Sequence, residues 1–164
     1  DYLSLYQTWA KYEPEQKGVL IAYASVYGNT EIAAKRLGET LQAMGCQNVV
    51  LRDLVKCDIT EAVSNAFCYD RLVLAATTYN GGRFPPLLPF VNALMERNYQ
   101  NRRIGIIENG SWSPTPARCI KGIFEHQKNI TYCEPIVTIR SCLSDESNQA
   151  LMALAENLKE PATT

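Results

Sequence analysis

The chain has 164 residues, of which 46% are hydrophobic and 20% charged, which is enough apolar material for the core of one domain. Its formal net charge is -1 and it contains no long run of like charge, so nothing indicates nucleic acid or an anionic membrane as a partner. No apolar stretch approaches the roughly 20 residues of a membrane-spanning helix. The cysteines and the single histidine lack the clustered spacing of a zinc site.

The first seventeen residues stand apart from the pattern that follows them. Tyr2, Leu5, Tyr6 and Trp9 share one helical face, and "YEPEQKG" after them has the composition of a polar linker. Two interpretations stay open: a local helix that packs back on the domain, or the tail of a preceding domain. We expect a linker or helix over residues 1–17, one α/β domain over 18–160, and a tail or linker over 161–164.

Five short apolar runs alternate with helical patterns through the rest of the chain. The predicted strands are "VLIAYAS" (19–25), "NVVLRDL" (48–54), "RLVLAATTY" (71–79), "RRIGIIENG" (102–110) and "ITYCEPIVTIR" (130–140). This alternation predicts a three-layer α/β sandwich with a five-stranded parallel sheet. Pro135 cannot donate to a ladder, so the fifth strand is expected at an edge or interrupted. That suits the order 2-1-3-4-5 without excluding other doubly wound orders.

Apolar side chains at helical spacing mark the helices between these strands. The first stripe is Ala33, Leu37, Leu41 and Met44, and Gly45 is expected to end that helix. The others are Leu87, Val91, Leu94 and Met95; Ala117, Ile120 and Phe124; and Leu151, Leu154 and Leu158, with Ser144 as a helix cap. Thr60 is the expected cap of a short helix that contains Ala62, Val63 and Ala66.

The six cysteines are spread along the chain and form no C-x-x-C pair: Cys46, Cys57, Cys68, Cys119, Cys133 and Cys142. We interpret them as buried or surface thiols in a reducing cytosol, which makes a cytoplasmic location the expected one.

The turn "SVYGNT" (25–30) leaves the first strand where ligands of such sheets bind, between strands one and three. Gly28 permits a tight turn whose N–H groups converge on an anion, and the following helix N-terminus adds partial positive charge. Ser25 and Thr30 add hydroxyls and Asn29 adds an amide. Neutral donors without a lysine suit a phosphate monoester, and neither a P-loop nor G-x-G-x-x-G is present. A turn that binds nothing has the same composition.

Two further loops leave the same end of the predicted sheet. "TTYNGGRFPP" (77–86) offers Thr78, Asn80 and the backbone donors of Gly81 and Gly82. "ENGSWSPTP" (108–116) offers Asn109, Gly110 and Ser111. Tyr79 and Trp112 are the candidates to flank a flat, π-rich ligand. The alternative for Trp112 is a surface anchor that packs its own loop.

The three loops together carry a resemblance to a known family. "SVYGNT" resembles the flavodoxin phosphate loop, (T/S)-x-(S/T)-G-x-T, with Tyr27 in place of a small hydroxyl residue. With "TYNGGRFP" and a tryptophan in the third loop, the chain is more similar to the flavodoxin-like domain of flavodiiron proteins, or A-type flavoproteins. The resemblance covers about residues 18–158, and "YLSLYQTWAKY" resembles the segment that joins this domain to an upstream diiron domain. "ENGSWSP" departs from the G-S-x-G-W pattern of many members.

The resemblance implies an FMN-binding electron-transfer module. The implied phosphate site is Ser25, Val26, Tyr27, Gly28, Asn29 and Thr30. The implied ring site is Thr78, Tyr79, Asn80, Gly81 and Gly82 on one side and Asn109, Gly110, Ser111 and Trp112 on the other. The implied partners are a redox donor, an upstream metallo-β-lactamase-like domain whose diiron centre reduces O2 to water or NO to nitrous oxide, and, in a diflavin member, a downstream flavin-reductase domain. The full-length protein is expected to be an oxidoreductase and a homo-oligomer.

Two rival interpretations remain. One is a free-standing flavodoxin or FMN-dependent NAD(P)H reductase, which the net charge of -1 disfavours because carrier flavodoxins are usually strongly acidic around the flavin. The other is a flavin-free structural module, which Tyr27 and the altered third loop keep open.

Overall fold

The computed structural model describes residues 16–24, 29–46, 48–54, 56, 58–77, 88–97, 99, 102–109, 130–133, 136–139 and 145–158. Its strands are β1 (Gln16–Ala24), β2 (Val49–Asp53), β3 (Tyr69–Thr77), β4 (Arg102–Asn109), β5 (Ile130–Tyr132) and β6 (Val137–Ile139). Its helices are α2 (Asn29–Ala43), α3 (Ile59–Cys68), α4 (Leu88–Glu96) and α6 (Asp145–Leu158).

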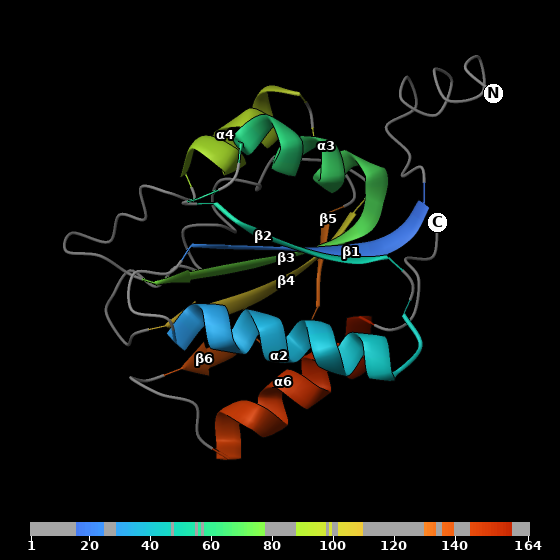
Figure 1. The fold of residues 1–164 in the computed structure, drawn as a ribbon, viewed down its shortest axis with the longest axis vertical. Coiled ribbons are helices and arrows are strands. Elements are labelled where there is room, and N and C mark those ends of the chain that lie inside the picture. The colour runs from blue at the N-terminus through green and yellow to red at the C-terminus, as the bar shows by residue number, and fades with distance from the viewer. Residues whose placement is uncertain are drawn as a thin grey trace.

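The strands form one sheet of order β2-β1-β3-β4-β5, with β6 also paired to β4, and every pairing is parallel. Helices α3 and α4 cover one face and α2 and α6 the other, as Figure 1 shows. The predicted three-layer α/β sandwich and its 2-1-3-4-5 order are therefore confirmed.

The fifth predicted strand is present as two short pieces on one edge of the sheet. Arg102 pairs with Ile130 and Ile107 pairs with Val137, so five steps along β4 correspond to seven along the partner strand. The two extra residues fall between β5 and β6, the interval that contains Pro135. An interrupted edge strand is what a residue without an N–H donor permits, as predicted.

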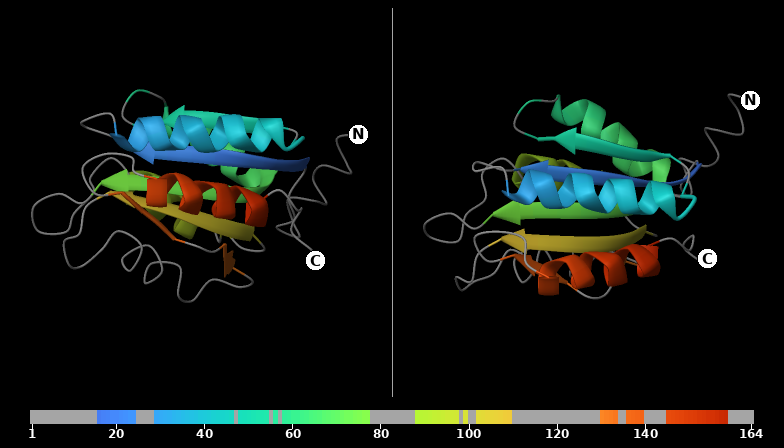
Figure 2. Two further views of the ribbon diagram at one scale, coloured as in Figure 1. Left: turned by 90° about the horizontal axis from the view of Figure 1, so that it is seen from below. Right: turned by 60° about the horizontal axis from the view of Figure 1, so that its bottom comes forward.

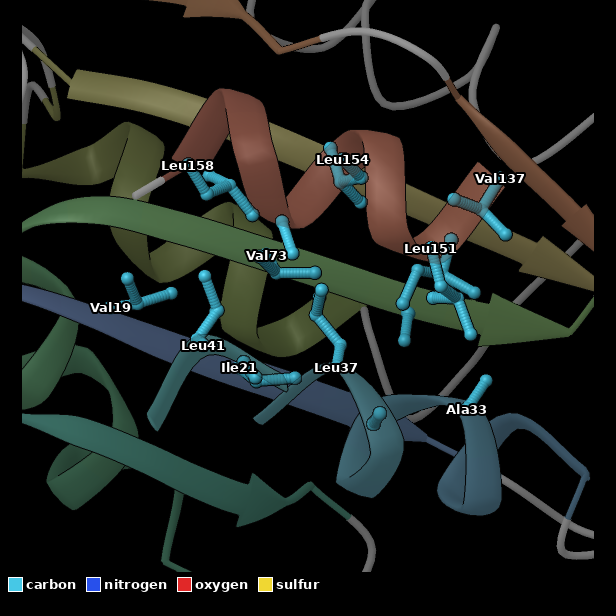
Figure 3. Packing of buried hydrophobic residues seen from close by; sticks show 14 of the residues in the cluster. Val19, Ile21, Ala33, Leu37, Leu41, Val73, Val137, Leu151, Leu154 and Leu158 are labelled. Carbon is cyan, nitrogen blue, oxygen red and sulfur yellow. The ribbon is translucent and has the colours of Figure 1, made fainter. Parts of the chain in front are cut away.

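The core lies on both faces of the sheet because the strand side chains alternate between them. On the α2/α6 face, Leu37 and Leu154 point from the two helices toward Ile21 and Val73 of the strands (Figure 3). Gly105 of β4 makes room for this packing, since a Cβ there would lie 3.3 Å from Leu154 Cδ1. Phe90 of α4 is also fully buried on the other face, although the predicted stripe of that helix did not include it.

Helix α2 ends at Gly45 as predicted, whereas the predicted N-cap of α3 is corrected. Gly45 has φ of +89°, and the Cys46 and Gly45 N–H groups donate to Leu41 O and Gln42 O, so the helix ends in a Schellman motif. The expected Thr60 cap of α3 is wrong. Asp58 is the cap, and its extended backbone lets its carboxylate accept from the Thr60 N–H at 2.9 Å.

A buried ion pair lies at the amino end of the sheet, where β1 begins at Gln16 rather than at the predicted residue 19. A register shift between Gln16 and Val19 places a bulge there, and Asp70 Oδ1 accepts from the Gly18 N–H at 3.0 Å. The same oxygen lies 3.1 Å from Arg71 Nε, and Arg71 Nη1 donates to Leu158 O at the end of α6. The pair therefore joins the start of β1 to the end of α6.

Arg102 is a second buried cation at this end of the sheet and is only 1% exposed. Its guanidinium donates to Phe67 O at 2.9 Å and Tyr69 O at 3.0 Å, the carbonyls at the end of α3. It also lies 5.3 Å from the centroid of the Tyr99 ring and 6.0 Å from that of Phe67. Burial lowers the pKa of this guanidinium, and the hydrogen bonds and rings compensate its charge.

Candidate functional site

The carboxyl ends of the strands meet the first turn of α2 at one edge of the molecule. Because the pairing is parallel, Tyr23–Ala24 of β1, Ala75–Ala76 of β3 and Glu108–Asn109 of β4 lie at neighbouring register positions. Figure 2 shows the strand arrowheads and the start of α2 toward this same edge. Only residues 25–28 separate β1 from α2. The sheet thus brings together the three places from which the predicted loops leave.

The first turn of α2 supplies the anion-binding part of this edge. Its leading N–H groups, from Asn29 onward, have no partner within the helix, and the aligned peptide dipoles give that end about half a positive charge. Thr30 is the second residue of the helix and is completely buried. A buried hydroxyl residue at the positive end of a helix is an arrangement that suits a bound anion.

Glu31 follows in the same turn, and its negative charge is held by basic neighbours. Lys35 Nζ lies 3.1 Å from its carboxylate one helical turn away. Lys35 is the main cause that keeps the pKa of Glu31 below its usual value, with smaller contributions from Lys56 and from a hydrogen bond with Tyr23. This partly exposed carboxylate is therefore ionised at neutral pH and paired with Lys35.

Few of the predicted site residues lie in the described part of the chain. Asn29 and Thr30 begin α2, and Asn109 is the last residue of β4, so the structure brings these three to the common edge. The other predicted residues lie outside the described residues: Ser25, Val26, Tyr27, Gly28, Thr78, Tyr79, Asn80, Gly81, Gly82, Gly110, Ser111 and Trp112. His126 and the Ala117, Ile120 and Phe124 stripe lie outside them as well.

Glu108 is a residue at this edge that sequence analysis did not single out. It is 6% exposed, among the most buried charged residues described. It pairs in register with Ala76 of β3 and Thr138 of β6. The signal was present in the sequence as a single carboxylate that closes the apolar run "IGII".

Other kinds of site find little support in the described residues. No group of three or more His, Cys, Asp or Glu side chains gathers there to hold a metal ion. Cys46, Cys68 and Cys133, the cysteines that the structure describes, are reduced thiols outside any disulfide, and burial raises the pKa of Cys133. None of the helices described combines the length and apolar character that crossing a membrane requires.

No protein-family model and no curated protein matches the chain. The chain does match a number of solved structures. The rubredoxin oxygen:oxidoreductase of Desulfovibrio gigas superposes with a TM-score of 0.83 at 20% identity, over 96% of this chain and 38% of that one. The flavodiiron protein of Giardia intestinalis gives 0.75 at 20% identity, over 96% and 39%. Flavodoxin 2 of Bacillus cereus gives 0.71 at 22% identity, over 87% and 97%.

These similarities establish a flavodoxin-like fold. The chain spans less than two-fifths of the two longer proteins and nearly the whole length of the flavodoxin.

Proposed function

We propose that this chain is an FMN-binding electron-transfer domain of the flavodiiron type. The observation that carries the proposal is the carboxyl edge between β1 and β3, where a four-residue connection leads into the N-terminus of α2 and the buried residue Thr30. A nucleotide phosphate is the anion that such an edge of a doubly wound sheet accommodates.

The chemistry of the described donors fits FMN. A phosphate monoester carries close to two negative charges at neutral pH, and helix amides with a hydroxyl stabilise them without a lysine. The basic residues Lys35 and Lys56 act on Glu31, so the carboxylate in the same turn is compensated. The donor set therefore favours a monophosphate over a neutral flavin.

The residues divide between the two parts of the cofactor. We assign the phosphate to Ser25, Val26, Tyr27, Gly28, Asn29 and Thr30. We assign the ring to Thr78, Tyr79, Asn80, Gly81 and Gly82 on one side and to Asn109, Gly110, Ser111 and Trp112 on the other. FMN supplies the capacity to accept and release electrons when bound, and the protein supplies orientation and electrostatics.

The described residues of the chain do three things in this assignment. The α2 amides and Thr30 anchor the phosphate, the closely packed strands β1, β3 and β4 fix the spacing of the loops, and buried residues around the edge exclude water. These roles belong to electron transfer and need no general acid or nucleophile.

The extent of the structural matches favours the flavodiiron type over a free-standing carrier. Two flavodiiron matches cover 96% of this chain, whereas the B. cereus flavodoxin covers 87%.

In a longer protein, the partners that we propose are an upstream diiron metallo-β-lactamase-like domain that reduces O2 or NO, a redox donor and, in a diflavin form, a downstream flavin reductase. Homo-oligomerisation and a cytoplasmic location belong to the same proposal.

A free-standing flavodoxin is the second candidate, because the chain covers 97% of the length of the B. cereus protein. Turnover of NAD(P)H by the isolated chain favours an FMN-dependent reductase, whereas its absence favours the electron-transfer domain.

A flavin titration tests the proposal directly. We expect FMN to bind at least about tenfold more tightly than riboflavin, which lacks the phosphate. Thr30→Val removes one hydrogen bond to a charged group, worth about 1.5–3 kcal/mol, and lowers FMN affinity about tenfold to a hundredfold. Its effect on riboflavin is small.

Thr40→Val is the matched control, since Thr40 lies near the other end of α2 and its hydroxyl donates to Arg36 O at 2.8 Å. Equal affinity for FMN and riboflavin would contradict the assignment of residues 25–30 to the phosphate. Binding of neither flavin leaves the structural module as the better explanation.

A further inference from the structure

A lysine from a distant part of the chain lies beside the first turn of α2. Lys56 belongs to the connection between β2 and α3. That connection is held against the end of β1, because the Leu54 N–H donates to Tyr23 O at 2.8 Å. It then turns, because the Lys56 N–H donates to Asp53 O at 3.1 Å. The fold thus places a positive charge at the carboxyl edge, although the stretch 25–30 contains no lysine.

Glu31 shows that the charge of Lys56 is felt in the first turn of α2. Glu31 Oε1 lies 3.1 Å from Lys35 Nζ, which is the close pair of this cluster. Lys35 is the main cause of the lowered pKa of Glu31, and Lys56 and a hydrogen bond with Tyr23 lower it further. Lys56 therefore acts on the same turn that contains the buried Thr30.

The charges of this cluster do not cancel. Two positive side chains, Lys35 and Lys56, act on the single carboxylate of Glu31, and the helix N-terminus adds partial positive charge. If Lys56 were neutral, Glu31 would remain together with Asp53 and the α3 cap in the neighbouring connection. The loss of this one lysine therefore makes the surroundings of the turn more negative, which disfavours an anion bound there.

We infer that Lys56 is a specificity-determining residue of the phosphate site, because its charge favours a flavin with a phosphate over a neutral flavin. The inference rests on the proposed FMN site and adds a charge to the amides and hydroxyls assigned there. It describes an attraction across the surface, not a contact with the ligand. FMN gains from that attraction because its phosphate carries close to two negative charges at neutral pH, whereas riboflavin has no phosphate to attract.

Titrations of Lys56 variants with FMN and riboflavin test the inference. We expect Lys56→Gln to lower FMN affinity about threefold to tenfold at low ionic strength and to leave riboflavin affinity unchanged. Lys56→Arg keeps the charge and should bind FMN as the wild type does. Roughly 1 M salt shortens the Debye length to about 3 Å and should remove most of the difference between Lys56→Gln and the wild type.

Glu31→Gln separates a role of charge from a role in shaping the turn. It keeps an oxygen that can accept from the Tyr23 hydroxyl but removes the negative charge, so FMN affinity should rise about threefold or more. If the cluster only held the turn in shape, Glu31→Gln and Lys56→Gln would both weaken FMN binding, because both break the same interaction. Opposite effects of the two variants are the result that a structural role does not produce.

Arg97→Gln is the matched control, because Arg97 is an exposed cation just beyond the C-terminal end of α4 and its loss changes the net charge equally. A loss of FMN affinity no larger in Lys56→Gln than in Arg97→Gln overturns the inference while the FMN site stands, and so does weaker FMN binding by Glu31→Gln. If the wild-type chain binds FMN no more tightly than riboflavin, the inference fails together with the proposed phosphate site.

Discussion

The buried pair of Asp70 and Arg71 yields a quantitative prediction for stability. The two side chains are 5% and 3% exposed, so water compensates neither charge; each acts on the other, and Asp70 also acts on Arg102. Asp70→Asn keeps the shape and an oxygen for the Gly18 N–H but removes the charge. Removing one partner of a buried pair costs about 3–5 kcal/mol, a large share of the 5–15 kcal/mol that stabilises a typical domain.

The double variant separates the ion pair from packing. Arg71→Met leaves Asp70 as a buried anion and takes a donor from Leu158 O, so it is expected to cost a similar amount. The double variant Asp70→Asn with Arg71→Met carries neither charge of the pair, so neither partner is left behind as a buried ion. It should therefore cost at least about 2 kcal/mol less than the sum of the single variants.

Urea unfolding followed by circular dichroism gives these free energies. Arg36→Gln serves as the control, because Arg36 also anchors α6, through Asn148 Oδ1 at 2.7 Å, but on the exposed surface. Its cost should stay below about 1 kcal/mol. Simple additivity of the two single variants, or a cost of Asp70→Asn no greater than that of the control, would refute the reasoning.

Three further predictions concern single residues. Gly105→Ala should cost about 1–3 kcal/mol in urea unfolding, because its Cβ would lie 3.3 Å from Leu154 Cδ1 and 3.4 Å from Val73 Cγ2. Because Leu154→Ala removes this crowding, the double variant should cost less than the sum of the two single variants. Gly45→Ala should cost about 1 kcal/mol from its φ of +89° alone, since nothing lies within 4 Å of the added Cβ, and a larger loss would contradict the open surroundings. Burial raises the pKa of Tyr99, so above about pH 10 the unfolded chain loses this proton first and stability falls as pH rises. Tyr99→Phe should flatten that alkaline decline, and an unchanged slope in unfolding free energy against pH would contradict it.

The sheet was predictable because its signals are local and repeat along the chain. Each apolar run of strand length lies between helical stripes, and that alternation allows few topologies. Pro135 then added a specific constraint, since a residue without an N–H suits an interrupted edge strand. The end of α2 at Gly45 was predictable because its signal is also local: glycine adopts the positive φ of a helix C-terminus more readily than other residues.

The buried charges were not predictable because they depend on contacts distant in sequence. Arg102 lies 35 residues from Phe67, whose carbonyl it binds, and Arg71 lies 87 residues from Leu158. From sequence, a charged residue at the start of a strand is ordinarily an exposed boundary. The cap of α3 failed for a different reason: Asp58 and Thr60 are both good caps, and only the backbone at Asp58 decides between them.

The residues of the candidate site also divide into those that local sequence signals predicted and those that depend on the fold. Asn29, Thr30 and Asn109 were predicted from motifs, and the parallel register brings their positions to one edge. Glu108 begins the stretch "ENGSWSPTP" but was not singled out, because its burial appears only when β4 is seen to end among neighbouring strands. The assignments on the loops beyond these strands stay predictions.

One electrostatic rule connects the two ends of this sheet. The helices run opposite to the strands, so their C-termini gather at the amino edge and their N-termini at the carboxyl edge. At the amino edge, Arg71 and Arg102 bind the last carbonyls of α6 and α3, where partial negative charge stabilises buried cations. The same polarity at the carboxyl edge favours buried negative charge, and Glu108 is found there. A phosphate bound at the first turn of α2 would be stabilised by the same helix dipoles, as an anion from a ligand instead of a side chain. The positions of the buried arginines and of the proposed cofactor site therefore both follow from the direction of the helices.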